Sequence, residues 1–128
     1  MSIEQAVQVR WTSYAPLTEL VPAERFVTGT LRDEPAMPYV SLSEEGETPD
    51  WRSSDGESIE TALRFTIVDE NLGRARKIAA RIKERFNRES FTTRDGNCYV
   101  MQWTNELRLP DEDGVWTVLV DYSSKRAV

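Results

Sequence analysis

The chain contains no histidine and only one cysteine, Cys98, among its 128 residues. Without histidine, the commonest general base and metal ligand is missing, and every Ser/His or Cys/His nucleophile pair is excluded. A single cysteine excludes an internal disulfide and a thiolate metal cage, and it is typical of a reduced, cytosolic protein. Cys98 has no basic neighbour in the sequence, so we interpret it as a small buried hydrophobic residue.

Long apolar runs and glycine-rich loops are also missing. No stretch reaches the roughly 18 apolar residues of a membrane span, and "MSIEQAVQVRW" is too short and too polar for a signal peptide. Gly73 lacks the spacing of a nucleotide-binding loop, and "DEDG" at 111–114 lacks the closing glutamate of a calcium loop. We therefore expect a soluble protein that is not an enzyme, uses no cofactor or metal and binds no membrane.

The residues that are present predict a single α+β domain over residues 1–128, because 39% hydrophobic content is enough for one core. Apolar spacing of three to four residues predicts helices, and alternation predicts strands. The expected elements are a helix over 3–14, a strand after Pro38, a strand over 58–67, a helix over 72–88, a strand over about 98–109, and a last strand over 115–123 followed by a fraying tail.

A long mobile loop is expected at about 43–57, "SEEGETPDWRSSDGE", because glycine, proline, serine and acids dominate it. Trp51 is its only large apolar residue. The carboxylates of Glu44, Glu45 and Glu47 are clustered there, but nothing nearby would desolvate one of them for acid catalysis. We interpret them as part of a solvated acidic loop.

These elements fit a two-layer sandwich in which one mainly antiparallel four-stranded sheet is packed by two helices. The other sheet face, with Glu60 and Arg64, would be left for solvent or a partner. The residues expected to be buried together are Phe65, Ile67, Ile78, Ile82, Val118 and Val120.

Charge is divided unevenly along the chain. The formal net charge is −6, yet residues 72–88 hold seven of the sixteen Lys and Arg residues against one acid, Glu84. On a helical wheel Arg74, Lys77, Arg81 and Arg85 form a row opposite the apolar stripe, here called the cationic row. The row is either an ordinary solvated face or a contact with nucleic acid or an acidic protein. It carries no side chains suited to reading bases, so we expect no sequence-specific nucleic-acid binding.

The segment from Asp33 to Glu60 offers a complement, since it contains nine acids and one basic residue, Arg52. The acidic loop of one copy could meet the basic helix of the next. Such a contact joins different patches, and repeated head to tail it closes a ring if the rotation allows. Trp51 would supply the apolar anchor that surface charge pairs need.

The order of these segments resembles a family. "LTELVPAERFVTG", "MPYVSLS", "ALRFTIVDENLGRARKIAARIKERF" and "VWTVLVDYS" together are similar to the small tail-completion, or tail-terminator, proteins of long-tailed bacteriophages and prophages. The resemblance covers nearly the whole chain and rests on element order and apolar patterns. The long acidic loop around Trp51 departs from the family's pattern.

The resemblance implies a subunit of a ring, commonly hexameric in related proteins, at the head-proximal end of the tail tube. Its partners would be further copies of itself, the tail tube protein and a head–tail connector protein. It would be assembled in the bacterial cytoplasm and then belong to the virion tail. The alternative is a stand-alone cytosolic protein-binding module without catalytic activity.

Overall fold

The computed structural model describes residues 3–28, 36–53, 56–92, 98–110 and 113–127. The helices are α1 (Ile3–Thr12), α2 (Ala15–Thr18), the short 3-10 helix η1 (Ala23–Arg25) and α3 (Leu72–Phe86). The strands are β1 (Phe26–Thr28), β2 (Tyr39–Ser53), β3 (Gly56–Asp69), β4 (Ser90–Thr92), β5 (Cys98–Pro110) and β6 (Trp116–Ala127). The α+β class expected from the sequence is confirmed.

The six strands of the described residues form one sheet in the order β1-β2-β3-β6-β5-β4. Among the described strand pairs, β1–β2 is the parallel one, through Phe26–Thr28 and Val40–Leu42. The prediction of four strands and two helices is wrong in detail. The structure has two further strands, β1 and β4, and each of them has three residues. Three residues are too few to show a periodic pattern, so such strands are recognised only from their long-range pairing.

The predicted loop at about 43–57 is also wrong. The backbone from Ser43 to Ser53 continues β2 and pairs antiparallel with β3 from Arg64 back to Gly56. Register shifts between Glu44 and Gly46 and between Pro49 and Trp51 mark two irregularities, and Gly46 has a φ of 154° that favours glycine. Backbone hydrogen bonds to the neighbouring strand β3 hold this polar segment extended, although it has no apolar alternation of its own.

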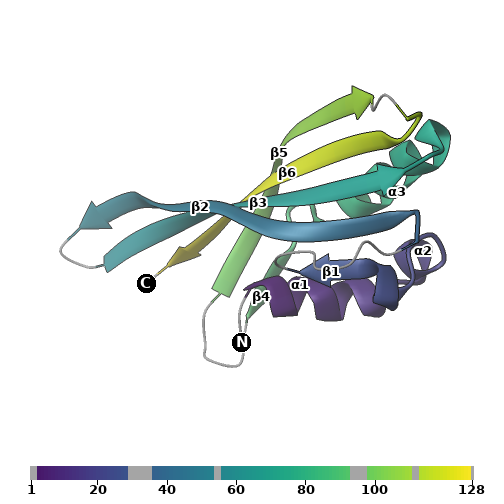
Figure 1. Cartoon of the computed structure of the whole chain (residues 1–128). Coiled ribbons are helices and arrows are strands. Elements are labelled where there is room, and N and C mark those ends of the chain that lie inside the picture. The colour runs from purple at the N-terminus through teal and green to yellow at the C-terminus, as the bar shows by residue number, and fades with distance from the viewer. Residues whose placement is uncertain (1–2, 29–35, 54–55, 93–97, 111–112, 128) are drawn as a thin grey trace.

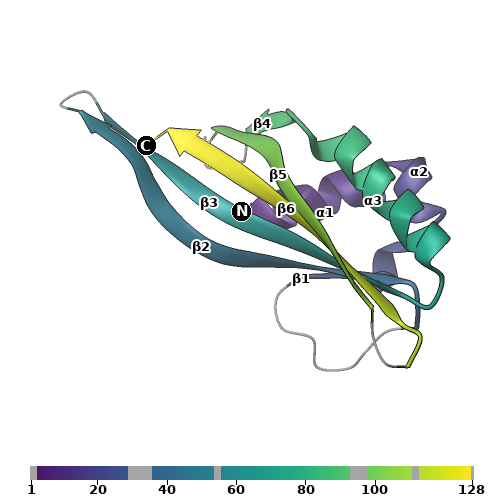
Figure 2. The ribbon, with the colours of Figure 1, turned by 90° about the horizontal axis from the view of Figure 1, so that it is seen from above.

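The distal parts of β2 and β3 project beyond the helices as an arm, seen in both views (Figures 1 and 2). The arm consists of β2 from Ser43 and β3 up to Ala62. Strand β6 follows β3 along part of this length, with Ser124 opposite Thr61 and Ala127 opposite Ser58. The tail expected to fray therefore belongs to the sheet as far as Ala127.

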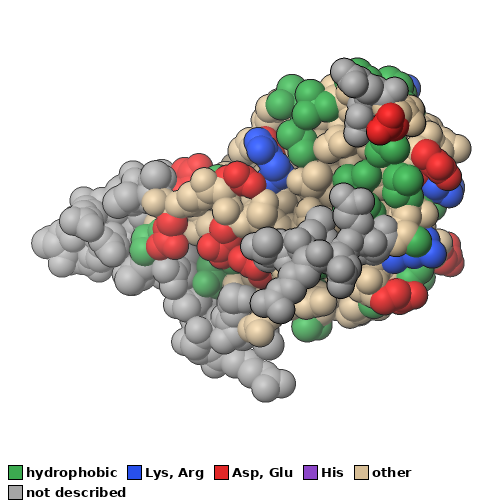
Figure 3. All heavy atoms as spheres, in the orientation of Figure 1, with side chains coloured by type: hydrophobic (Ala, Val, Ile, Leu, Met, Phe, Trp, Pro, Cys, Tyr) green, Lys and Arg blue, Asp and Glu red, His purple; other side chains and the backbone are tan. Residues whose placement is uncertain are grey.

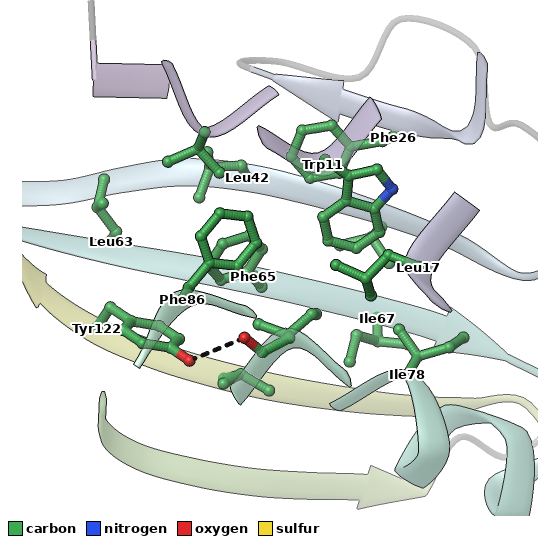
Figure 4. Packing of buried hydrophobic residues seen from close by; sticks show 14 of the residues in the cluster. Trp11, Leu17, Phe26, Leu42, Leu63, Phe65, Ile67, Ile78, Phe86 and Tyr122 are labelled. Atoms are coloured by element: carbon green, nitrogen blue, oxygen red, sulfur yellow. Dashed lines mark hydrogen bonds between the residues drawn. The ribbon is translucent and has the colours of Figure 1, made fainter. Parts of the chain in front are cut away.

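The core lies between one sheet face and the three α-helices (Figure 1). Trp11 stacks on Phe26 with ring centroids 4.3 Å apart, and its indole nitrogen donates to the Val21 carbonyl. Phe65 packs 5.5 Å from Phe86 and edge-on to Tyr122 at 5.7 Å (Figure 4). The six residues expected to be buried together are all in this cluster, which confirms that the strand and helix stripes face each other.

Candidate interaction surfaces

Helix α3 begins where the sequence suggested, because the Asn71 side chain caps it by accepting from the Arg74 backbone N–H at 3.0 Å. The helix buries one stripe against the sheet: Ala75, Ile78, Ala79, Ile82 and Phe86. The cationic row lies on the remaining faces, as the helical wheel predicts. Its four members, however, differ in their surroundings.

Arg74 is tied to the protein's own interior. Its guanidinium donates to both oxygens of Asp69 at 2.6 Å, and the Asp69 side chain is fully buried. Hydrogen bonding to this carboxylate raises the pKa of Arg74, so the guanidinium keeps its charge. The pair joins the end of β3 to the first turn of α3, and Arg74 is therefore mainly structural.

Arg81 and Arg85 also have partners within the chain. Arg81 donates to both oxygens of Glu84 at 2.8 Å, on the surface of the helix. Arg85 pairs with Glu89 at 3.2 Å, and its guanidinium lies 5.6 Å from the centroid of the Tyr14 ring. Among the described residues, Lys77 is the member of the cationic row that is exposed and has no ion pair.

The acidic candidates lie on the arm. Glu44, Glu45 and Glu47 are exposed on β2, and acidic side chains gather where the arm leaves the body, in the left half of Figure 3. Burial, followed by the neighbouring Glu44, raises the pKa of the Glu4 carboxyl on α1. Negative charge is thus crowded at this place. Trp51 is in β2, but its side chain lies outside the described part of the structure.

A second tryptophan, not singled out by the sequence patterns, is exposed on β5. Trp103 is 40% exposed, its indole N–H donates to the Asn105 carbonyl, and the Lys83 ammonium lies 4.6 Å from its ring. Lys83 pairs with Glu106 at 2.7 Å, and Arg108 approaches the same carboxylate at 3.8 Å.

Two leucines of the same strand, Leu107 and Leu109, are 46% and 48% exposed. We call this surface the β5 rim and define it by Trp103, Leu107 and Leu109 with Lys83, Glu106 and Arg108. In the sequence, a tryptophan and two leucines within one strand are the signal for this surface. The strand pattern alone does not give the register of β5, so it does not show that these side chains are exposed.

The sheet face away from the helices has a polar centre. Arg64 on β3 donates to both oxygens of Asp121 on β6, at 2.8 and 3.3 Å. Leu107 is opposite Leu119, and Leu109 is opposite Thr117, so both exposed leucines belong to this face. This sheet face therefore combines an ion pair at its centre with exposed leucines on β5.

Within the described part of the chain, no group of three or more His, Cys, Asp or Glu side chains could hold a metal ion. None of the described helices is both long and apolar enough to cross a membrane.

The fold and these surfaces together define a class: a small α+β protein with charged and apolar side chains exposed on its described surface. Comparison with protein families gives the class a name. The model of the family described as tail completion protein gp17 matches residues 5–124, and the chain belongs to this family of structural phage tail proteins.

The fold also has a close counterpart among solved structures. A chain in a structure described as the virion of a native gene transfer agent particle superposes with a TM-score of 0.80. The match covers 99% of this chain and 96% of that one at 13% identity, so it shows the shared fold. No curated protein matches the sequence.

Proposed function

We propose that the protein completes the tail by forming a ring at the head-proximal end of the tail tube. The ring would cap the tube and present a surface to which the head joins. The family match over residues 5–124 is the observation that carries this proposal. The virion particle with the same fold supports it, since that chain belongs to a phage-like assembly.

The partners in this proposal are further copies of the chain, the tail tube protein and a head–tail connector protein. A ring of six is the order that the family resemblance implies. Assembly would take place in the bacterial cytoplasm, before the protein becomes part of the virion tail. We propose that the whole chain acts as a single domain, without catalysis, cofactor or sequence-specific contact with nucleic acid.

Removing the gene from the phage or prophage that carries it tests the function. Electron microscopy of the lysate should show heads and tails that remain separate. Purified protein added to that lysate should restore joined particles, whereas Ile82→Asp protein, which cannot keep its core, should not. Normal joined particles in the absence of the gene would overturn the proposal.

Contacts between copies are proposed to use the acids of the arm, Glu44, Glu45 and Glu47, and the cationic row, with Trp51 as an apolar contact. Charge pairs of this kind chiefly set register and association rate. Lys77 is the member best placed for a partner, because Arg74 is held by Asp69.

Reversing Arg81 and Arg85 to glutamate tests the row. We expect weaker docking onto tail tubes, measured by co-sedimentation, with the monomer still folded by circular dichroism. Added salt should weaken the wild-type contact modestly, since exposed pairs are screened over about 8–10 Å at physiological ionic strength. Intact docking, together with binding of duplex DNA in a gel shift at that salt, would instead make the row a phosphate-binding surface.

A further inference from the structure

Two long strands of the sheet have outer edges that no described strand covers. Strand β1 pairs with β2 only at Val40–Leu42, although β2 continues to Ser53. Strand β4 pairs with β5 only at Cys98–Val100, although β5 continues to Pro110. Contacts from residues 87–89 extend the cover of β5 as far as Trp103. From Ser43 on β2 and from Thr104 on β5, the described structure therefore shows a row of backbone groups open to another strand.

The two open edges lie on opposite sides of the sheet and at opposite ends of it. The open part of β2 runs beside β3 from Arg64 back to Gly56. The open part of β5 is opposite β6 from Asp121 to Trp116, which itself pairs with β3 from Arg64 to Asp69. In Figure 2 the open part of β2 is therefore at the upper left of the sheet and the open part of β5 at the lower right. A second copy shifted along this diagonal would bring its β5 edge beside the β2 edge of the first.

Strand directions fit such a contact. The pairs β2–β3, β3–β6 and β6–β5 are all antiparallel. Strands β2 and β5 therefore run in opposite directions within one molecule. When two copies have the same orientation, the β2 edge of one meets the β5 edge of the other antiparallel, which is the more stable kind of pairing. A small rotation between copies would curve the extended sheet around an axis.

The charges of the two edges are complementary. Glu44 and Glu45 are exposed on the β2 edge. The β5 rim has two cations, Lys83 and Arg108, around one carboxylate, Glu106. Arg76 is exposed and precedes Lys83 by seven residues, so the two lie on the same side of α3. Arg76 therefore adds to the positive charge near the β5 rim. Two β2 edges would bring acids together, so like edges repel and unlike edges attract.

Apolar side chains border the β5 edge on both faces of the sheet. Trp103 is opposite the buried Tyr122 and so lies on the helix side, whereas Leu107 and Leu109 lie on the open side. A strand added to this edge would cover all three. Hydrophobic side chains are visible along the upper rim of the molecule, where β5 runs (Figure 3). Apolar contacts within a charged surround are the usual anatomy of a protein interface.

We propose that the β2 edge of one copy adds as a strand to the β5 edge of the next copy, so that the sheet continues from subunit to subunit. The partner is a second copy of this chain, and the contact is heterologous, as a closed ring requires. The inference rests on the proposed ring and assigns its interface to particular strands. It also adds Trp103, Leu107 and Leu109 of the β5 rim to the apolar residues that the contact buries.

Disulfide trapping tests the contact. Cys98 is the only cysteine, so Cys98→Ser, or Cys98→Ala if the first folds poorly, gives a cysteine-free background. In that background one protein carries Glu44→Cys or Glu47→Cys, and the other carries Leu107→Cys or Leu109→Cys. The two are mixed, assembled on tail tubes and oxidised. Glu24→Cys, on the exposed η1, is the control position.

A covalent dimer should form between a β2 cysteine and a β5 cysteine in at least one combination. Two β2 cysteines, or either strand with the control position, should give none above background. If assemblies form and dock but no β2–β5 dimer appears, the edge pairing is wrong and the ring proposal stands. If the cysteine-free protein folds but never assembles on tubes, the ring and the pairing fail together.

Discussion

At the scale of single residues, the pair of Asp69 and Arg74 stabilises the junction between β3 and α3. The carboxylate is fully buried, and besides Arg74 it accepts a hydrogen bond from the Asn71 backbone N–H at 3.1 Å. It thereby fixes the turn between β3 and α3. A buried charge with one partner removed is strongly destabilising, whereas an exposed pair contributes little.

Arg74→Met should therefore lower the free energy of unfolding by about 3 kcal/mol, because it leaves the Asp69 carboxylate buried without its cation. Arg81→Met is the matched control, since Arg81 forms its pair with Glu84 on the surface of the same helix. We expect no measurable change for it. Urea denaturation of both variants measures the difference, and equal effects would show that Asp69 does not depend on Arg74.

Glu4 is the residue with a pH-dependent effect on stability. Burial, and then the neighbouring Glu44, raises the pKa of its carboxyl in the folded state. The folded protein therefore holds this proton more tightly than the unfolded chain. The stabilisation is fully present below the unfolded pKa of about 4.3 and is lost as pH rises through the raised folded value.

Glu4→Gln should consequently raise the stability at pH 7, by less than about 1 kcal/mol, and change it little at pH 4. Thermal unfolding of both proteins between pH 4 and pH 7 gives the comparison. A variant less stable than the wild type at pH 7 would mean that the favourable position of Glu4 in the first turn of α1 outweighs its repulsion from Glu44.

Helix α3 is the element that the sequence predicts best. Its start at Leu72 and the burial of Ile78 and Ile82 follow from local spacing, and each is found in the structure. Strand β3 is equally clear, because Leu63, Phe65 and Ile67 alternate with polar residues. In both elements one face is buried, so apolar residues recur in the sequence at the period of a helix or of a strand.

Elements without such a face could not be predicted. The distal part of β2 has no apolar alternation and is a strand because β3 pairs with it. The cationic row was predicted on the correct side of α3, but its ion pairs were not. Asp69 pairs with Arg74, and Glu89 pairs with Arg85. The spacing of these residues in the sequence does not specify the side-chain geometry that brings them together. Exposure of Trp103 likewise depends on the register of β5 after a shift between Trp103 and Asn105.

Ile82→Asp tests the packing of α3. The Ile82 side chain is fully buried, so an aspartate there would place an unpaired charge in the core and cost more than about 4 kcal/mol. Lys77→Asp, exposed on the same helix, should cost less than about 0.5 kcal/mol. Circular dichroism at 25 °C should show Ile82→Asp unfolded and Lys77→Asp folded. A folded Ile82→Asp protein would place that stripe of the helix outside the core.

At the scale of the whole molecule, we propose different roles for the arm and for the body, which is the part of the described structure outside the arm. Every described residue of the core cluster on β2 precedes the arm, and on β3 the cluster begins at Leu63, just after it. Folding therefore depends on the body, in which apolar burial is the main favourable term. The arm extends the sheet past the helices, and its described β2 edge is the one that we propose for assembly.

Shortening the arm separates the two roles. Residues 50–58 are replaced by Asn-Gly, which suits a two-residue turn between the paired Pro49 and Ile59. The midpoint of thermal unfolding should shift by less than about 4 °C, because the change leaves the described core intact. Binding to tail tubes and formation of joined particles should be weakened, since the open β2 edge ends at Pro49 instead of Ser53 and Trp51 is removed. A shortened protein that assembles normally would show that the distal arm is not an interface, and one that unfolds would show that the arm belongs to the folding unit.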